Sequence, residues 1–136
     1  MLKIMIDTNI LIAGGVLQSK YIQDLFGCIS ENHIIILPDY VISEFKNTVE
    51  NKFPKRFDSA ELFLKTFPFE LVYVPEDFDA ESFPDIRDSK DLPILVSAIS
   101  EDVDVFITND KDFKALSIKR PEILNPQEFL EKYNIK

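Results

Sequence analysis

The stretch LKIMIDTNILI, residues 2–12, places an aspartate between two apolar runs. Residues 2–6 are apolar at four of five positions, which predicts a short buried β-strand. Ile10 and Leu11 begin a second apolar pattern near helical spacing, so a helix is expected to follow. Asp7, at the junction, has to be solvated, paired or bound to a cation, because burying an ionised group alone is costly.

The alternation of strand and helix recurs along the chain. Short apolar runs predict further strands at 33–37, 70–74 and 103–108. Gly14-Gly15 predicts a break between two helical segments, and Asp58 with Glu61 resembles a capping box. Other helix starts are predicted at Pro38-Asp39, in the first turn of 91–102 around Pro93, and at Asn125, where Pro126 and Glu128 complete an N-terminal signal. Nearly continuous apolar strands alternating with helices predict a single α/β domain over 1–136, a three-layer α/β/α sandwich with a mainly parallel central sheet.

Composition narrows the class of protein. Hydrophobic residues make up 46% of the chain, which predicts a globular protein, and 3 glycines do not suggest a Gly-rich phosphate loop. No apolar run approaches the roughly 18 residues that span a bilayer, and no signal peptide is recognisable, so a cytoplasmic protein with no membrane partner is expected. Cys28 is the single cysteine, which argues against a zinc site. A net charge of −9 argues against a broad basic surface that binds nucleic acid. Bound divalent cations can nevertheless reverse the charge of an acidic pocket.

Acidic residues stand at five informative places: Asp7, Glu44, Asp88, Asp91 and Asp110. Each can be a helix cap, a macrodipole partner or a solvated side chain. In parallel sheets, however, functional groups gather beyond the carboxyl ends of strands, and Asp7 and Asp110 both follow predicted strands. Converging carboxylates would repel each other unless a proton or cation intervened, and oxygen ligands suit Mg²⁺ or Mn²⁺.

Four segments resemble, in order, the acidic motifs of PIN-domain nucleases: MIDTNIL at the N-terminus, SEF around Glu44, RDSKDLPILVSA from Arg87 and TNDKDF from Thr108. The resemblance covers essentially the whole chain and looks closest to VapC-like toxins of toxin-antitoxin pairs. It implies a Mg²⁺- or Mn²⁺-dependent ribonuclease with a cognate antitoxin protein as partner. The residues it implies as catalytic, metal-binding acids are Asp7, Glu44, Asp91 and Asp110, with Asp88 and Asp112 in support and Asn9 and Thr108 positioning the ligands.

The basic residues and the Phe-rich segment each allow two interpretations. Lys52, Lys55, Arg56 and Arg87 are candidate RNA contacts, or ordinary solvated residues. The Phe-rich segment 53–69 is a candidate docking surface for the antitoxin, or it fills the core or a homodimer seam. His33, the only histidine, heads a strand away from the acids, and it is not expected to act in general acid-base catalysis.

Two other classes of function compete with a nuclease. A phosphatase of the haloacid-dehalogenase type would place a second aspartate two residues after Asp7, where this chain has Asn9. A PIN-like fold can also serve as a non-catalytic binding module. The distances among the carboxylates discriminate between these possibilities.

Overall fold

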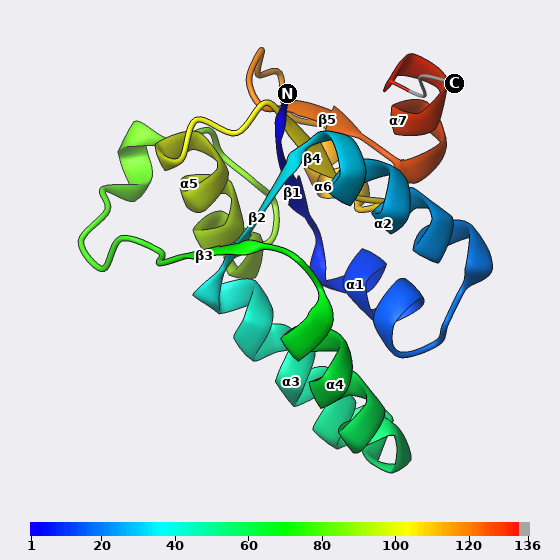
Figure 1. Ribbon diagram of the computed structural model, residues 1–136. Coiled ribbons are helices and arrows are strands. Elements are labelled where there is room, and N and C mark those ends of the chain that lie inside the picture. Colours follow the sequence, from blue (N-terminus) through cyan, green and yellow to red (C-terminus); the bar gives the residue numbers. More distant parts are fainter. Residues whose placement is uncertain (134–136) are drawn as a thin grey trace.

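A computed structural model describes residues 1–133 and contains one five-stranded sheet in the order β3-β2-β1-β4-β5 (Figure 1). Every neighbouring pair of strands is parallel, which confirms the predicted α/β class. The strands are β1 (Lys3–Ile6), β2 (Ile34–Pro38), β3 (Glu70–Val72), β4 (Val105–Ile107) and β5 (Glu122–Leu124). Because all five run the same way, the residues that follow β1 and β4 emerge at one edge of the sheet.

Helices flank the sheet on both sides. The helices are α1 (Thr8–Gly15), α2 (Lys20–Asn32), α3 (Asp39–Lys52), α4 (Phe57–Thr66), α5 (Leu92–Ser100), α6 (Lys111–Lys114) and α7 (Pro126–Tyr133). Figure 1 shows α2 and α7 on one side of the sheet and α5 on the other, while α3 and α4 project away from it as a pair. Within residues 1–133, no helix is both long enough and apolar enough to cross a bilayer.

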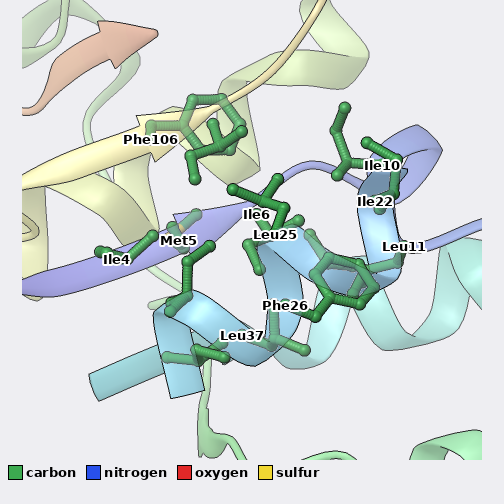
Figure 2. Close-up of a cluster of buried hydrophobic side chains, with 14 of the residues drawn as sticks. Ile4, Met5, Ile6, Ile10, Leu11, Ile22, Leu25, Phe26, Leu37 and Phe106 are labelled. Carbon is green, nitrogen blue, oxygen red and sulfur yellow. The ribbon is translucent and has the colours of Figure 1, made fainter. Parts of the chain in front are cut away.

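The core forms around the central strand. Ile4, Met5 and Ile6 are all fully buried, as expected for a strand covered on both faces. Figure 2 shows side chains of β1, α1, α2 and β4 gathered in one cluster, which includes Leu25 and Phe106. This packing holds β1, and therefore Asp7 at its end, in a fixed place.

The two glycines of α1 allow neighbouring helices to approach closely. A Cβ atom on Gly15 would lie 2.5 Å from the ring of Phe63 in α4, and one on Gly14 would overlap the ring of Phe26 in α2. The predicted break at Gly14-Gly15 is confirmed, since α1 ends at Gly15 and α2 begins at Lys20.

Of the phenylalanines in the 53–69 segment, Phe67 is buried in the core, and Phe53, Phe63 and Phe69 are partly buried and pack against it. The Phe67 ring centroid lies 4.9 Å from those of both Phe26 and Phe63. Phe63 also packs against Phe45 of α3. Phe57, in contrast, stays 39% exposed. The core interpretation therefore holds for Phe63 and Phe67, and it leaves Phe57 at the surface.

Three details of the predicted elements were wrong. A fifth strand, β5, was missed, because three residues after Pro121 are too few to show a period. The capping box of Asp58 does not form, since the turn Pro54–Arg56 runs directly into α4 and leaves no extended N-cap residue. The strand predicted to reach residue 74 ends at Val72, because the Val74 N–H donates to Asp39 Oδ1 at 3.0 Å instead of continuing the ladder.

The capping box at the start of α7 is confirmed. Asn125 Oδ1 accepts a hydrogen bond from the Glu128 N–H at 2.8 Å, and Glu128 Oε1 accepts one from the Asn125 N–H at 2.9 Å. This reciprocal pair fixes the loop between β5 and α7.

Candidate metal centre

Three carboxylates meet beyond the carboxyl end of β4. Asp91, Asp110 and Asp112 each offer an oxygen atom, and these atoms all lie within 4.8 Å of one another. Asp91 directly precedes α5, while Asp110 caps α6 through a 2.9 Å hydrogen bond from the Asp112 N–H. The short helix α6 therefore holds two acids of this triad in a fixed relation.

Asp7 lies beside the triad and is linked to it by Thr108. The Asp7 N–H continues the ladder with Ile107 of β4, which aligns the ends of the two strands. The buried Thr108 hydroxyl donates to Asp7 Oδ2 at 2.6 Å and accepts from the Asp110 N–H at 3.0 Å. Asp7 Oδ1 accepts from the Thr8 N–H at 2.8 Å, so the same side chain caps α1. Asp7 thus caps α1 with one carboxylate oxygen and contacts Thr108 with the other, and its role as a metal ligand stays a prediction.

Glu44 approaches the site from α3. Its Oε1 atom accepts a 2.9 Å hydrogen bond from the hydroxyl of Thr8, which directly follows Asp7. Burial raises the pKa of Glu44, and the negative charges of Asp7 and Asp88 raise it further. Glu44 therefore lies within the electrostatic field of the acids, at the margin of the triad.

Asp88 and Arg87 form the rim of the site. Asp88 Oδ1 accepts from the Lys90 N–H at 3.0 Å and caps the turn that leads to Asp91. Arg87 Nε donates to Asp112 Oδ1 at 2.9 Å, although the Arg87 side chain is largely exposed. One acid of the triad thus has a cationic partner at the surface.

Burial and repulsion between neighbouring carboxylates make the protonated forms of Asp91 and Asp7 more favourable. Burial raises the pKa of Asp91 to about 7, with further contributions from the charges of Asp110, Asp88 and Asp7. Burial also raises the pKa of Asp7, against the lowering effect of its hydrogen bonds from Thr108 and Thr8. A divalent cation would relieve the same repulsion without a proton.

A pH-dependent gain in stability is expected for Asp91→Asn in the metal-free protein. Folded Asp91 keeps a proton that the unfolded chain loses above its ordinary pKa of 3.8, so Asp91 destabilises the fold progressively up to about pH 7. The variant's gain in free energy of unfolding should grow from pH 4 to pH 7 and then stay constant. The gain should reach about 1 kcal/mol, because solvent screens the charge of the partly exposed Asp91. Urea unfolding in EDTA between pH 4 and pH 8 measures it. A variant advantage independent of pH would contradict the raised pKa.

Thr108→Val is expected to weaken metal binding about 10- to 100-fold, because Thr108 orients the acids Asp7 and Asp110 and the loss of such an orienting group typically has an effect of this size. Valine keeps the shape but removes both hydroxyl contacts, to Asp7 and Asp110, so a stability loss of about 1–3 kcal/mol is also expected. Calorimetric titration with Mn²⁺ and urea unfolding measure the two effects. Thr108→Ser, which keeps the hydroxyl, serves as the matched control, and equal metal affinity of all three proteins would refute the orienting role.

Several predicted residues lie outside this cluster. Asn9 is exposed in the first turn of α1, and within residues 1–133 its carboxamide makes no hydrogen bond to the acids. Lys52 and Lys55 lie near the far end of α3, roughly 12 Å along the helix axis from Glu44. Arg56 donates to the Val16 carbonyl at 2.8 Å and so fastens the end of α1.

Two residues of the site were missed by sequence reasoning. Thr8 connects Glu44 to the Asp7 turn, and its signal was a second polar residue inside an apolar run. The Tyr40 hydroxyl donates to the Lys90 carbonyl at 2.9 Å. Burial raises the pKa of Tyr40, and the negative charge of Glu44 raises it further. No local pattern around Tyr40 indicates this contact.

The donor set fits a metal ion with oxygen ligands. The triad supplies carboxylates alone, and within residues 1–133 no cysteine or histidine joins it. Hard divalent cations prefer such oxygen ligands, whereas softer metals select thiolate or imidazole. The fold and the site together define a parallel α/β protein with an acidic centre able to bind a metal ion.

Comparison with known proteins identifies the family. A family model described as "PIN domain" matches residues 4–119, so the chain belongs to the PIN-domain family. The search among curated proteins gave no significant match.

Solved structures show the same fold. VapBC2 from Rickettsia felis, bound to a DNA fragment from its promoter, aligns with a TM-score of 0.72 at 20% identity over 91% of this chain and 98% of its own. DNA-bound VapBC from Salmonella typhimurium aligns with a TM-score of 0.65 at 19% identity, over 93% and 99% of the two chains. The sarcin-ricin loop cleaving toxin VapC20 from Mycobacterium tuberculosis aligns with a TM-score of 0.63 at 16% identity, over 85% and 95%.

Proposed function

We propose that this protein is a divalent-metal-dependent endoribonuclease of the VapC type, acting on RNA in the cytoplasm as the toxin of a toxin-antitoxin pair. The observation that carries the proposal is the convergence of Asp91, Asp110 and Asp112 within 4.8 Å in a chain of the PIN-domain family. Asp7, coupled to Asp110 through Thr108, extends the same acidic surface.

Asp91, Asp110 and Asp112 would hold the metal ion, with Asp7 beside them and Glu44 at the margin, and the oxygen ligands favour Mg²⁺ or Mn²⁺. When bound, such an ion polarises a phosphate oxygen and lowers the pKa of an attacking water. The chain itself mainly positions these groups: Thr108 orients Asp7, Thr8 orients Glu44, and α6 sets Asp110 against Asp112. Without the cation, the acids would repel the RNA backbone.

Metal removal tests this function. The purified protein should cleave RNA in Mg²⁺ or Mn²⁺ and lose the activity in EDTA, because without a cation the clustered carboxylates repel the phosphate and cannot stabilise its developing negative charge. Electrophoresis of end-labelled RNA before and after metal is restored measures the effect. Cleavage that persists undiminished in EDTA would refute the metal-dependent reaction.

A non-catalytic binding module is the second candidate, and the Arg87 contact with Asp112 favours it, because a guanidinium already balances one acid of the triad. The two functions separate with Arg87→Ala. A nuclease should still cleave RNA and should bind metal more tightly in this variant, because Asp112 then lacks its cationic partner, whereas a binding module should show no cleavage with or without Arg87. The phosphatase alternative receives no support from the comparisons, which identify a PIN domain.

A cognate antitoxin is the proposed protein partner, as in the VapBC complexes that share this fold. Since Phe63 and Phe67 are used in the core, the apolar surface left for docking on α4 consists of Phe57 and Leu62, which are 39% and 61% exposed. Co-expression with the product of the neighbouring gene, followed by purification, tests the partnership. Replacement of Leu62 by Lys should reduce co-purification while the isolated protein keeps its activity.

A role in RNA binding stays a proposal for Lys52, Lys55, Arg56 and Arg87. Lys52 and Lys55 are exposed and can reach a phosphate. Arg56 and Arg87 already contact the Val16 carbonyl and Asp112, which leaves them fewer donors for RNA.

A further inference from the structure

A cleft of about 410 Å³ is lined by residues of α1, α2, the β4–α6 connection and the start of α7. Its volume falls within the roughly 300–1,000 Å³ typical of small-molecule sites. Asn9 lies on its wall two residues after Asp7, and Asn109 lies on its wall directly before Asp110. The cleft therefore adjoins two of the acids through the backbone that carries them.

The lining of the cleft is neutral. None of its residues is charged, although the chain as a whole carries a net charge of −9. Four carboxamides line it, from Asn9, Asn109, Asn125 and Gln127, together with the ring of Tyr21, a residue that is 48% exposed. Without a cationic side chain and next to carboxylates, the cleft disfavours a phosphate. Its aromatic and amide groups match a neutral, planar ligand with donors and acceptors on its edge.

The carboxamides divide into two pairs. Asn125 accepts from the Glu128 N–H, and Gln127 donates to Glu131 Oε1 at 3.1 Å, so these two side chains are held in place. Asn9 and Asn109 are both exposed, and their carboxamides make no hydrogen bonds with any residue in 1–133. Their donors and acceptors remain available to a ligand.

We propose that this cleft binds one unstacked nucleobase of the RNA strand, with the base stacked on Tyr21 and its edge hydrogen-bonded to the carboxamides of Asn109 and Asn9. Single-stranded RNA is recognised by aromatic stacking and by hydrogen bonds to splayed bases, and carboxamides suit base edges because they both donate and accept. The proposal rests on the proposed ribonuclease function, and it makes the cleft the place where the base next to the scissile phosphate is selected.

The first test measures base binding without metal and without chemistry. Adenosine, guanosine, cytidine and uridine are titrated separately into ¹⁵N-labelled protein in EDTA, and the side-chain amide signals of Asn9 and Asn109 are followed by NMR. At least one nucleoside should shift both signals saturably, with a dissociation constant on the order of millimolar. Tyr21→Ala should weaken this binding about 10-fold or more, whereas Tyr21→Phe should retain it.

Tyr73→Ala is the matched control, because Tyr73 is 70% exposed and does not line the cleft. In cleavage assays Tyr21→Ala should raise KM about 10-fold with kcat nearly unchanged, and Asn109→Ala should alter the preferred base beside the cut. Tyr73→Ala should behave as the unchanged protein in both assays.

The outcomes separate the two proposals. Nucleoside binding at the cleft in a protein that cleaves no RNA would overturn the nuclease function and leave the base site standing. Metal-dependent cleavage with no amide shifts, and with Tyr21→Ala equal to the unchanged protein, would overturn the base site alone. If Tyr21→Ala instead abolished co-purification of the antitoxin without any nucleoside shift, the cleft would belong to the partner protein and the base site would be refuted.

Discussion

Asp110→Asn is expected to reduce metal-dependent RNA cleavage by more than about 100-fold. Even the loss of a residue that only orients metal ligands lowers metal affinity or activity about 10- to 100-fold. Asp110 belongs to the triad, and its backbone N–H donates a hydrogen bond to the Thr108 hydroxyl. Asparagine removes the charge but keeps an oxygen that can accept from the Asp112 N–H, so the cap of α6 should survive. The loss of activity should therefore occur in a folded protein.

The measurement compares cleavage rates in saturating Mn²⁺ with urea unfolding of the same preparations. Asp58→Asn is the matched control, because it removes one negative charge from an exposed position on α4, outside the triad. It should cleave at the rate of the unchanged protein. Full activity in Asp110→Asn would show that the triad does not supply the metal ligands for cleavage.

Phe113→Ala should cost about 3–5 kcal/mol of unfolding free energy, as expected for a fully buried phenylalanine. The Phe113 ring packs edge-on against Phe106 of β4, with a centroid separation of 4.8 Å. Helix α6 has four residues and cannot be stable on its own, so this ring anchors it to the sheet. The variant should also lose metal affinity, because α6 carries Asp112 and is capped by Asp110.

Phe113→Leu is the matched control, since it keeps an apolar side chain and should cost less than about 1.5 kcal/mol. Urea unfolding in EDTA measures stability, and calorimetric titration with Mn²⁺ measures affinity where the variant remains folded. Should the alanine variant be too unstable to titrate, the leucine variant still tests the coupling, because its affinity should fall less than tenfold. A loss below 1 kcal/mol for Phe113→Ala would mean that α6 is held by other contacts.

The site was only partly predictable because its residues serve two purposes at once. Asp7 and Asp110 are helix caps by their hydrogen bonds with Thr8 and Asp112, and a cap is the ordinary interpretation of an aspartate after a strand. Their contact through Thr108 is what makes them neighbours in a site. Asp112 was predicted as a supporting acid, yet it completes the triad, because the short helix turns its carboxylate toward Asp91.

The sequence by itself determined the class of fold and the edge at which the acids gather. Apolar runs such as residues 2–6 and 33–37 form interior strands because they can be covered on both faces, and the helices between them are the usual crossover connections of a parallel sheet. An acid directly after such a strand can be placed at the carboxyl end of that strand even when the neighbouring strands are unknown. Two of the four family motifs, around Asp7 and Asp110, lie at these ends, whereas Glu44 lies within α3 and Asp91 directly precedes α5.

Only the tertiary structure decided which acids meet. Thr108 contacts Asp7 across 101 residues of sequence, and Thr8 contacts Glu44 across 36, because β1 lies between β2 and β4 in the sheet. Strand order and register set these distances, and both depend on long-range packing that no local periodicity encodes. The neutral cleft arises in the same way, from Tyr21 and Asn109 brought together from distant segments. The local sequence determines the chemistry of each side chain, but the packing of the sheet determines which side chains lie within a few ångströms of one another.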